Sequence, residues 1–434
     1  QHWWHEETGR GIRTRFSDDY LWLPYAVARY IEHTEDDTLL DERVPYLQSE
    51  SLSGGEHERY EETKVSQHIG TVYEHALRAI DLALRKIGEH GLPLIGIGDW
   101  NDGMSSIGDE GRGESVWLAW FLCTVLEQFV HLCRRRGDVE LADRYRKSSM
   151  QLARAANEHA WDGQWYRRGF TDSAYWIGSI QNEECRIDAI AQSWSVISGA
   201  GARDKAIQAM HSFDRELVDR STAIARLLTP PFNRTTPSPG YIQAYPPGIR
   251  ENGGQYTHGV IWSIIAWCLL GEGEKAVELF QILNPVNHTK TPAEVRTYTG
   301  EPYAMAADVY TAYPHEGRAG WTWYTGAAGW MYQAGIEWIL GLRRRGNRLY
   351  IRPCIPDHWP GFTVRYRYGS SYYTITVKNG NGYDMAGSTY DDNVKATVKE
   401  QPDDHTAYVD LVDDGQHHRL EIILGETTLI RGQV

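Results

Sequence analysis

Apolar residues recur at spacings of three and four along most of the chain, up to about residue 342. Such spacing places them on one face of an α-helix. Long Gly- and Pro-rich connections such as 92–111 and 229–254 are longer than ordinary turns between helices. Because long ordered loops tend to be functional, the pattern favours an all-α toroid whose long loops build one face. A solenoid is the alternative, although no repeat of fixed period stands out. The segments with the helical period are 69–87, 116–133, 141–160, 187–199, 260–270, 274–283 and 321–342, and another follows 20–27.

The period changes to two after about residue 342. Segments 348–351, 362–366, 372–377 and 418–424 alternate and are rich in β-branched and aromatic residues, which is typical of strands. The chain is therefore predicted to be mainly α, with a helical domain over 1–342 and a small β domain over 343–434.

Composition narrows the function classes. The chain has 434 residues, a formal net charge of −14, 24% charged residues and 41% hydrophobic residues, which indicates a folded rather than a disordered protein. A net negative charge argues against a nucleic-acid partner. No apolar run approaches the roughly 20 residues that span a bilayer, so no membrane segment is expected. Trp (17) and Tyr (26) outnumber Phe (8), which suits both a large core and sugar-like ligands.

Cofactor and metal motifs are missing from the sequence. The five cysteines are scattered without a Cys-x-x-Cys pair, which excludes a disulfide framework and a Cys-type zinc site and fits a reducing compartment. The stretch from His2 to Glu6 lacks the His-Glu-x-x-His spacing of a zinc helix. Nucleotide-binding Gly-rich motifs are also lacking. We therefore expect neither a metal nor an organic cofactor.

The densest polar and aromatic stretch contains Asp99, Trp100, Asn101 and Asp102 between flanking glycines. An aromatic wall beside a carboxylic acid is what glycosyl chemistry requires: a surface for the sugar ring and a proton donor for the leaving oxygen. The structural alternative is an Asx-turn that caps the next helix.

Two further clusters join polar and aromatic residues without an apolar period. The first includes Tyr245 and Glu251 and ends at His258, which opens a helix where it could meet an anion; a capping histidine is the alternative. The second, 317–330, alternates small and aromatic residues around Thr325, a possible donor to an oxyanion; close helix packing is the alternative.

Together these segments resemble the inverting sugar phosphorylases of glycoside hydrolase family 94, which include cellobiose and chitobiose phosphorylases. The likeness is strongest to the C-terminal phosphorylase-like region of cyclic β-1,2-glucan synthases, and it runs from residue 1 to the end. It rests on the motifs TRFSDDYLWLPYA (14–26), GDWNDGM (98–104), GRGESVW (111–117), IDAIAQSW (187–194), YPPG (245–248), EPY (301–303) and WYTG (323–326).

The resemblance implies a six-hairpin (α/α)6 barrel followed by a small C-terminal β-sandwich. Only about ten helices can be counted where the barrel needs about twelve, so the barrel is expected to be incomplete at its N-terminus. The resemblance also implies the chemistry: inorganic phosphate, the co-substrate, attacks the anomeric carbon while Asp102 protonates the glycosidic oxygen. Implied roles for other residues are substrate binding by Trp100, Asp99, Tyr245 and Glu251, and phosphate binding by His258 and Thr325.

Two departures from the family pattern stand out. The chain contains no Arg-Asp-x-x-Gln segment, so we expect a fragment that lacks this segment and the N-terminal β-sandwich. Ala307 replaces a sugar-binding Gln of the cellobiose-type enzymes, which favours a β-1,2-glucan. The expected reaction is phosphorolysis of a β-linked glucan to α-glucose 1-phosphate. The expected setting is the bacterial cytoplasm, with tethering to the inner membrane through the preceding part, in a homodimer or a larger polypeptide.

Two alternatives remain open. An inverting hydrolase on the same fold would need a second carboxylate about 6.5–9.5 Å from the acid, for which Asp188 and Glu251 are the candidates. A non-catalytic glucan-binding or regulatory region of a larger synthase is the other.

Overall fold

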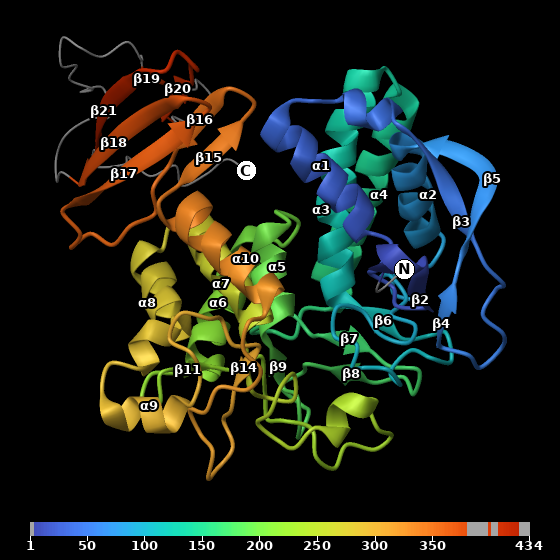
Figure 1. Ribbon diagram of the computed structural model, residues 1–434. Helices are drawn as coiled ribbons and strands as arrows, with labels where there is room; N and C mark the ends of the chain where they lie inside the picture. The colour runs from blue at the N-terminus through green and yellow to red at the C-terminus, as the bar shows by residue number, and fades with distance from the viewer. Residues whose placement is uncertain (1–3, 380–397, 401–406, 425–434) are drawn as a thin grey trace.

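The computed structural model describes residues 4–379, 398–400 and 407–424, and it consists of a helical region followed by a β region (Figure 1). The helical period of the sequence reflects real helices, although 69–71 belong to a strand and 321–324 precede α10. The α-helices are α1 (Trp22–Thr34), α2 (Val72–Leu84), α3 (Val116–Arg136), α4 (Val139–His159), α5 (Ala189–Ile197), α6 (Arg203–Leu217), α7 (Thr257–Leu270), α8 (Gly273–Leu283), α9 (Pro292–Tyr298) and α10 (Thr325–Gln333), which continues as a π-helical turn, η5 (Ala334–Ile339).

Helices α1, α3, α5, α7 and α10 contact one another in that order, while α2, α4, α6 and α8 pack outside them. The inner helices α3 and α7 are apolar on nearly all sides because neighbours surround them, and Trp117, Trp120 and Trp262 are fully buried. The outer helices are amphipathic and keep a polar face to solvent. This arrangement confirms a mainly α protein built from helical hairpins, and the closed six-hairpin ring stays a prediction.

Helix α3 corrects one expectation from the sequence. Over Val116–Arg136 it is long and apolar enough to cross a bilayer by length and composition, although no such run was expected. Most of its apolar window is buried inside the helical core, where α4, α5 and α1 pack against it. Its hydrophobicity is therefore explained by its central position among the helices.

The N-terminal segment forms small sheets that the sequence pattern did not predict. Their side chains are mostly exposed, so they carry no continuous apolar face. The strands are β1 (Trp4–His5), β2 (Arg10–Thr14) and β4 (Glu58–Glu62) in one sheet, and β3 (Arg43–Gln48) with β5 (Lys64–Thr71) in another; short 3-10 turns are η1 (Glu6–Thr8) and η2 (Thr38–Asp41).

The long loops gather at one end of the helices, at the bottom of Figure 1. Two-residue strands and 3-10 turns hold them in place. These are β6 (Glu114–Ser115), β7 (Gly169–Phe170), β8 (Trp176–Ile177), β9 (Ile187–Asp188), β10 (Val218–Asp219), β11 (Ile224–Ala225), β12 (Leu228–Thr229), β13 (Gln255–Tyr256), β14 (Asp308–Val309), η3 (Tyr241–Ala244) and η4 (Pro285–His288).

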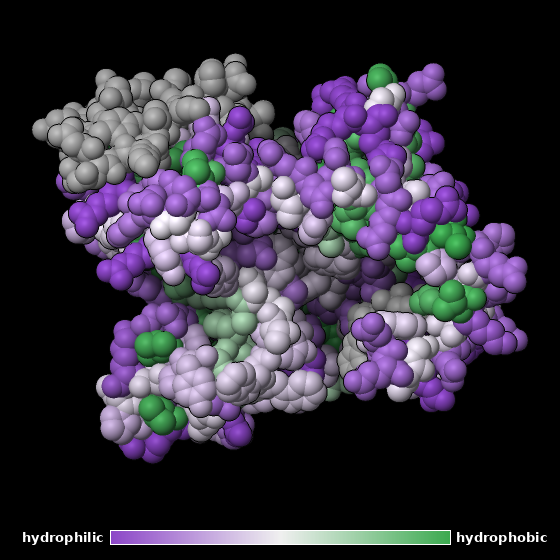
Figure 2. All heavy atoms as spheres, turned by 45° about the horizontal axis from the view of Figure 1, so that its top comes forward, coloured by the Kyte–Doolittle hydropathy of each residue, from purple (hydrophilic) through white to green (hydrophobic). Residues whose placement is uncertain are grey.

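From Leu342 onward the chain forms a β region, whose two sheets share one core. One sheet has the order β15 (Leu342–Arg345), β16 (Arg348–Ile351), β20 (Ala407–Asp410), β19 (Val398–Glu400); the other has the order β17 (Gly361–Tyr368), β18 (Ser371–Asn379), β21 (His417–Leu424). Leu349, Tyr373 and Ile375 are among the buried side chains between the sheets. The β region lies at the end of the helices opposite the long loops (Figure 1). The face in Figure 2 is mostly hydrophilic, with hydrophobic side chains scattered across it.

Candidate active site

The N-termini of the inner helices α3, α7 and α10 meet beneath the long loops. Ser115 caps α3 and donates a hydrogen bond from its hydroxyl to Asp99 at 2.6 Å. Tyr256 precedes α7, and its ring centroid lies 5.6 Å from that of Trp100. Tyr324 precedes α10 and forms a side-chain hydrogen bond with Tyr256. The three candidate clusters of the sequence therefore converge at one site.

Asp99 lies under the loop that carries the predicted acid. Its two carboxylate oxygens accept hydrogen bonds from the guanidinium of Arg168 at 2.6 and 2.8 Å, and Oδ1 also accepts the backbone N–H of Asn101 at 3.0 Å. Asp99 and Arg168 are both 0% exposed. Asp99 therefore anchors the loop to Arg168, and the sugar contact expected of it from the sequence stays a prediction.

Asp102 is half-buried at the top of the same loop, near a second carboxyl group, Asp18. Asp18 is 5% exposed and accepts a hydrogen bond from the indole of Trp22 at 2.9 Å. Burial raises the pKa of Asp18 well above its usual value, and the nearby charge of Asp102 raises it further. Burial raises the pKa of Tyr241, and the negative charge of Asp102 raises it further. Tyr241 therefore lies near the predicted acid.

Trp100 stands on an aromatic floor built by the start of α7. Its ring centroid lies 5.0 Å from Trp262 and 5.3 Å from His258, the latter edge to face at 88°. Gly259 leaves room for the indole, because a Cβ added there would lie 2.7 Å from Cη2 of Trp100. The packing fixes the Trp100 ring, two residues before Asp102 in the sequence, while leaving the residue partly exposed.

The first turns of α7 and α10 offer donors for an anion. Among the described residues, neither N-cap side chain forms a capping hydrogen bond, and in α7 the N–H of Thr257 donates instead to the carbonyl of Ala307 at 2.9 Å. Nε2 of His258 is buried and has no hydrogen-bond partner in the described part of the chain. Burial lowers the pKa of His258 to about 4, so the imidazole is neutral at neutral pH. Thr325 is exposed at the first position of α10, and a Cβ on Gly326 would lie 3.6 Å from Nδ1 of His258.

Tyr245 and Glu251 meet through Arg250, which the sequence analysis did not single out. The guanidinium carbon of Arg250 lies 5.0 Å from the ring centroid of Tyr245, and Nε lies 3.4 Å from Oε2 of Glu251. The backbone N–H of Arg250 donates to Asp308 at 2.7 Å, and burial raises the pKa of Asp308 to about 6. Arg250 is the positively charged residue between Tyr245 and Glu251. This charge within a candidate segment was the sequence feature that could have identified it.

Asp188 is the other carboxylate considered as a water-activating base. It is 0% exposed, caps α5 through the N–H of Ile190 at 2.9 Å, and lies 3.6 Å from Nε of Arg168. Burial raises its pKa to about 6. Asp188 therefore lies in the interior next to the Asp99–Arg168 pair, away from the surface on which a sugar could bind.

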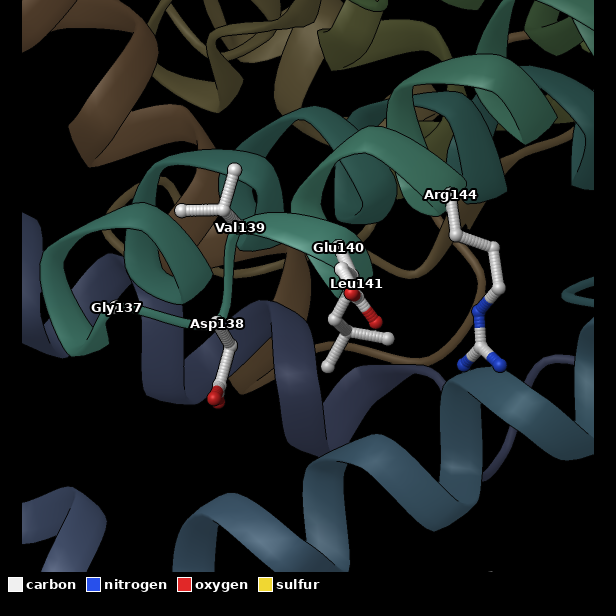
Figure 3. Close-up of a pocket in the computed structure, with 6 residues that line it drawn as sticks. All are labelled: Gly137, Asp138, Val139, Glu140, Leu141 and Arg144. Atoms are coloured by element: carbon white, nitrogen blue, oxygen red, sulfur yellow. The ribbon is translucent and has the colours of Figure 1, made fainter.

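Other candidate sites lie elsewhere or lack ligands. Among residues 4–379, 398–400 and 407–424, no group of three His, Cys, Asp or Glu side chains could hold a metal ion, and His2 lies outside these ranges. A cavity of about 670 Å³ opens at the turn between α3 and α4 (Figure 3), at the opposite end of α3 from the site. There Asp138 accepts a hydrogen bond from Tyr73 at 2.8 Å, and Arg144 pairs with Asp81 at 2.7 Å.

Known relatives share most of the chain. Cyclic beta-(1,2)-glucan synthase NdvB from Rhizobium meliloti (strain 1021) is 46% identical over 377 residues, which cover 87% of this chain and 13% of that protein. Solabiose phosphorylase from Paenibacillus borealis is 32% identical, with coverages of 84% and 45%. N,N'-diacetylchitobiose phosphorylase from Vibrio furnissii is 30% identical, with coverages of 87% and 44%. The chain thus spans less than half the length of these relatives.

The family assignment rests on the part of the chain that builds the site. A family model described as "Glycosyl hydrolase 94 superfamily, catalytic domain" matches residues 1–341, which include every helix N-terminus and loop described above. The chain therefore belongs to the glycosyl hydrolase 94 superfamily, through the catalytic domain of that family.

Proposed function

We propose that the chain catalyses inverting phosphorolysis of a β-linked glucan, with a β-1,2-glucan as the favoured substrate. The carrying observation is the position of His258. Its buried Nε2, which has no hydrogen-bond partner among the residues that the structure describes, lies at the start of α7 beside the start of α10. The His258 ring contacts Trp100 directly, on the loop that carries Asp102. Helix N-termini with unsatisfied N–H groups are ready sites for phosphate.

In the proposed reaction, Asp102 supplies the proton and phosphate supplies the nucleophile. A phosphate oxygen forms the new bond to C1 of the sugar as the bond from C1 to the glycosidic oxygen breaks. The proton of Asp102 passes to that leaving oxygen, and inversion at C1 gives α-glucose 1-phosphate. Because phosphate is already anionic, no second carboxylate is needed to activate it.

The proposal also gives the remaining residues their roles. Trp100 holds the attacked sugar against the aromatic floor, His258 and Thr325 hold phosphate with the backbone N–H groups of α7 and α10, and Tyr245 lines the side of the leaving sugar. Glu251 acts through its ion pair with Arg250. We assign Asp99 to positioning the loop, since its carboxylate is buried against Arg168.

Support for phosphorolysis over hydrolysis comes from the two alternative bases. Asp188 is buried beneath the loop anchor, and Glu251 is paired with Arg250 at 3.4 Å. Several named relatives are phosphorylases, and the 46% identical relative is a β-1,2-glucan synthase. Ala307 is 4% exposed and offers no polar side chain to a sugar, which fits the β-1,2 preference over a cellobiose-type one.

The decisive experiment measures the products from linear β-1,2-glucan, cellobiose and chitobiose with and without inorganic phosphate. We expect α-glucose 1-phosphate from β-1,2-glucan, only when phosphate is present. Asp102→Asn should abolish the reaction, while His258→Ala should raise the KM for phosphate far more than the KM for glucan. Sugar release that is independent of phosphate would establish a hydrolase, and glucan binding without turnover would establish a binding region.

A further inference from the structure

Three large aromatic side chains stand exposed on the segment that leads into α10. Tyr303 is 76% exposed, Trp321 is 66% exposed and Trp323 is 65% exposed. Rings of this size are ordinarily buried to a large extent, and a group of them on a surface marks a binding site. We call these three residues the outer aromatic group.

The outer aromatic group is held in a fixed arrangement. The rings of Tyr303 and Trp323 pack edge to face, with centroids 5.9 Å apart, and the indole N–H of Trp323 donates to Glu301 at 3.3 Å. Trp323 has φ of +62°, a left-handed conformation that is unfavourable for a bulky residue unless its surroundings impose it. A backbone hydrogen bond from Ala307 to the carbonyl of Trp321 at 2.5 Å fixes the same segment.

Trp321 is joined to the proposed active site through Arg250. The guanidinium of Arg250 lies 5.0 Å from the ring centroid of Tyr245 and also 5.0 Å from that of Trp321. Trp321 therefore extends the side of the site that Tyr245 lines, beyond Arg250. The same segment continues through Tyr324 to Thr325 at the start of α10. A ligand that extends past Tyr245 and Arg250 would therefore reach Trp321.

The chemistry of this surface suits a sugar chain. Pyranose rings present apolar C–H faces that pack on aromatic rings, while their hydroxyls need hydrogen-bond partners. Glu301 and Arg250 supply such partners beside the rings. Hydrogen bonds, first from Thr322, hold the pKa of Glu301 below its ordinary value, so it is an ionised acceptor.

We propose that Tyr303, Trp321 and Trp323 bind sugar units of a β-glucan beyond the unit next to the cleaved bond, so that the site takes an extended chain. This inference rests on the proposed function for the direction of the chain, but binding by the outer aromatic group does not require turnover. It names a property that the catalytic residues alone do not supply: preference for substrate length.

The test compares linear β-1,2-glucan oligosaccharides of two to six units in the unchanged chain and in a Tyr303→Ala/Trp323→Ala variant, with Trp321→Ala as a separate variant. We expect kcat/KM to rise with length in the unchanged chain. In the variants, the ratio of kcat/KM for the hexasaccharide over the disaccharide should fall about tenfold, which corresponds to the loss of one or two aromatic contacts. Tyr60→Ala, which removes an exposed tyrosine from β4, is the matched control and should leave the ratio unchanged.

Binding separates this inference from the proposed function. Calorimetry without phosphate should show tighter binding of the hexasaccharide than of the disaccharide, and the variants should lose that difference even if the chain turns out to be a hydrolase or a binding region. Equal losses for both lengths would overturn the proposal, as would no loss for either. A change of oligomeric state in the variants without a change in glucan affinity would assign the surface to a second copy of the chain and would also overturn it.

Discussion

Arg168 donates two hydrogen bonds to the carboxylate of Asp99, from Nη1 to Oδ2 at 2.8 Å and from Nη2 to Oδ1 at 2.6 Å, and both side chains are fully buried. The pair joins two loops that are 69 residues apart in sequence. Ser115 at the start of α3 donates to the same carboxylate. The loop that carries Asp102 is therefore attached to the helical core through a buried ion pair. Each side chain compensates the charge of the other, so removing one leaves a buried, uncompensated charge.

Replacement of Arg168 by Met should destabilise the protein strongly. Removing one partner of a buried ion pair leaves an uncompensated charge, here on Asp99, with Asp188 only 3.6 Å from Nε of Arg168. We expect a loss of about 3–5 kcal/mol in the free energy of unfolding, measured by urea denaturation. Arg154→Met is the control, because Arg154 is 85% exposed and its ion pair is with Glu158 on the same helix face. That variant should lose less than about 0.5 kcal/mol, and similar losses in both would contradict the anchor role.

A single methyl group at Gly259 should disturb the active site from below. The added Cβ would lie 2.7 Å from Trp100 and 2.8 Å from Leu227, so both side chains or the helix backbone must move. Gly259→Ala should cost about 1–3 kcal/mol of stability through overpacking and should lower kcat for glucan. Gly329→Ala on α10 is the matched control, since nothing lies within 4 Å of its Cβ position. It should gain about 0.5–1 kcal/mol, the helix preference for Ala over Gly.

The residues of the site differ in how far the sequence could reveal them. The motif around Trp100 and Asp102 could be predicted because an aromatic residue beside an acid between glycines has a chemical meaning on its own. The buried pairing of Asp99 with Arg168 could not, because Arg168 reaches the loop from a distant segment without a motif. Arg250 lies in the same segment as Tyr245, but its contact with Trp321 arises only when two distant loops fold together.

The secondary structure likewise includes elements that the sequence could predict and elements that it could not. Inner helices such as α3 and α7 could be predicted because a continuous apolar core leaves a strong helical period. The N-terminal strands β3 and β5 carry mostly exposed side chains, so no buried face imposes a period of two on their sequence. Helix α6, Arg203–Leu217, was not among the predicted helices, although its buried apolar residues Ala206, Ala209, Met210 and Phe213 recur at helical spacing.

Asp18→Asn should stabilise the protein at neutral pH. Burial raises the pKa of Asp18 in the folded state well above its usual value of 3.8. The folded state therefore binds more protons than the unfolded state above pH 3.8, and stability falls as pH rises through the interval up to the folded pKa. Asparagine removes this cost. We expect the variant to be more stable than the unchanged chain at pH 7 and the difference to shrink toward pH 3.8, as measured by urea unfolding across pH. If the variant were less stable than the unchanged chain at pH 7, contacts other than the hydrogen bond from Trp22 would have to stabilise the ionised Asp18 carboxylate.

His258 should give the opposite dependence on pH. Burial lowers its folded pKa to about 4, below the ordinary value of 6.5. Between these values the unfolded state binds more protons than the folded state, so the stability contribution is complete above pH 6.5 and is lost as pH falls toward 4. The loss amounts to about 2–3 kcal/mol over that interval, at about 1.4 kcal/mol per pH unit.

In His258→Gln the titrating group is gone, so the difference in unfolding free energy between the unchanged chain and this variant should rise from pH 4 to 6.5 and then stay level. Because Asp188 and Asp308 titrate near pH 6 in both proteins, the subtraction removes their contribution. A flat difference across this range would mean that His258 is solvated in the folded protein, and the neutral imidazole assigned to phosphate binding would have to be abandoned.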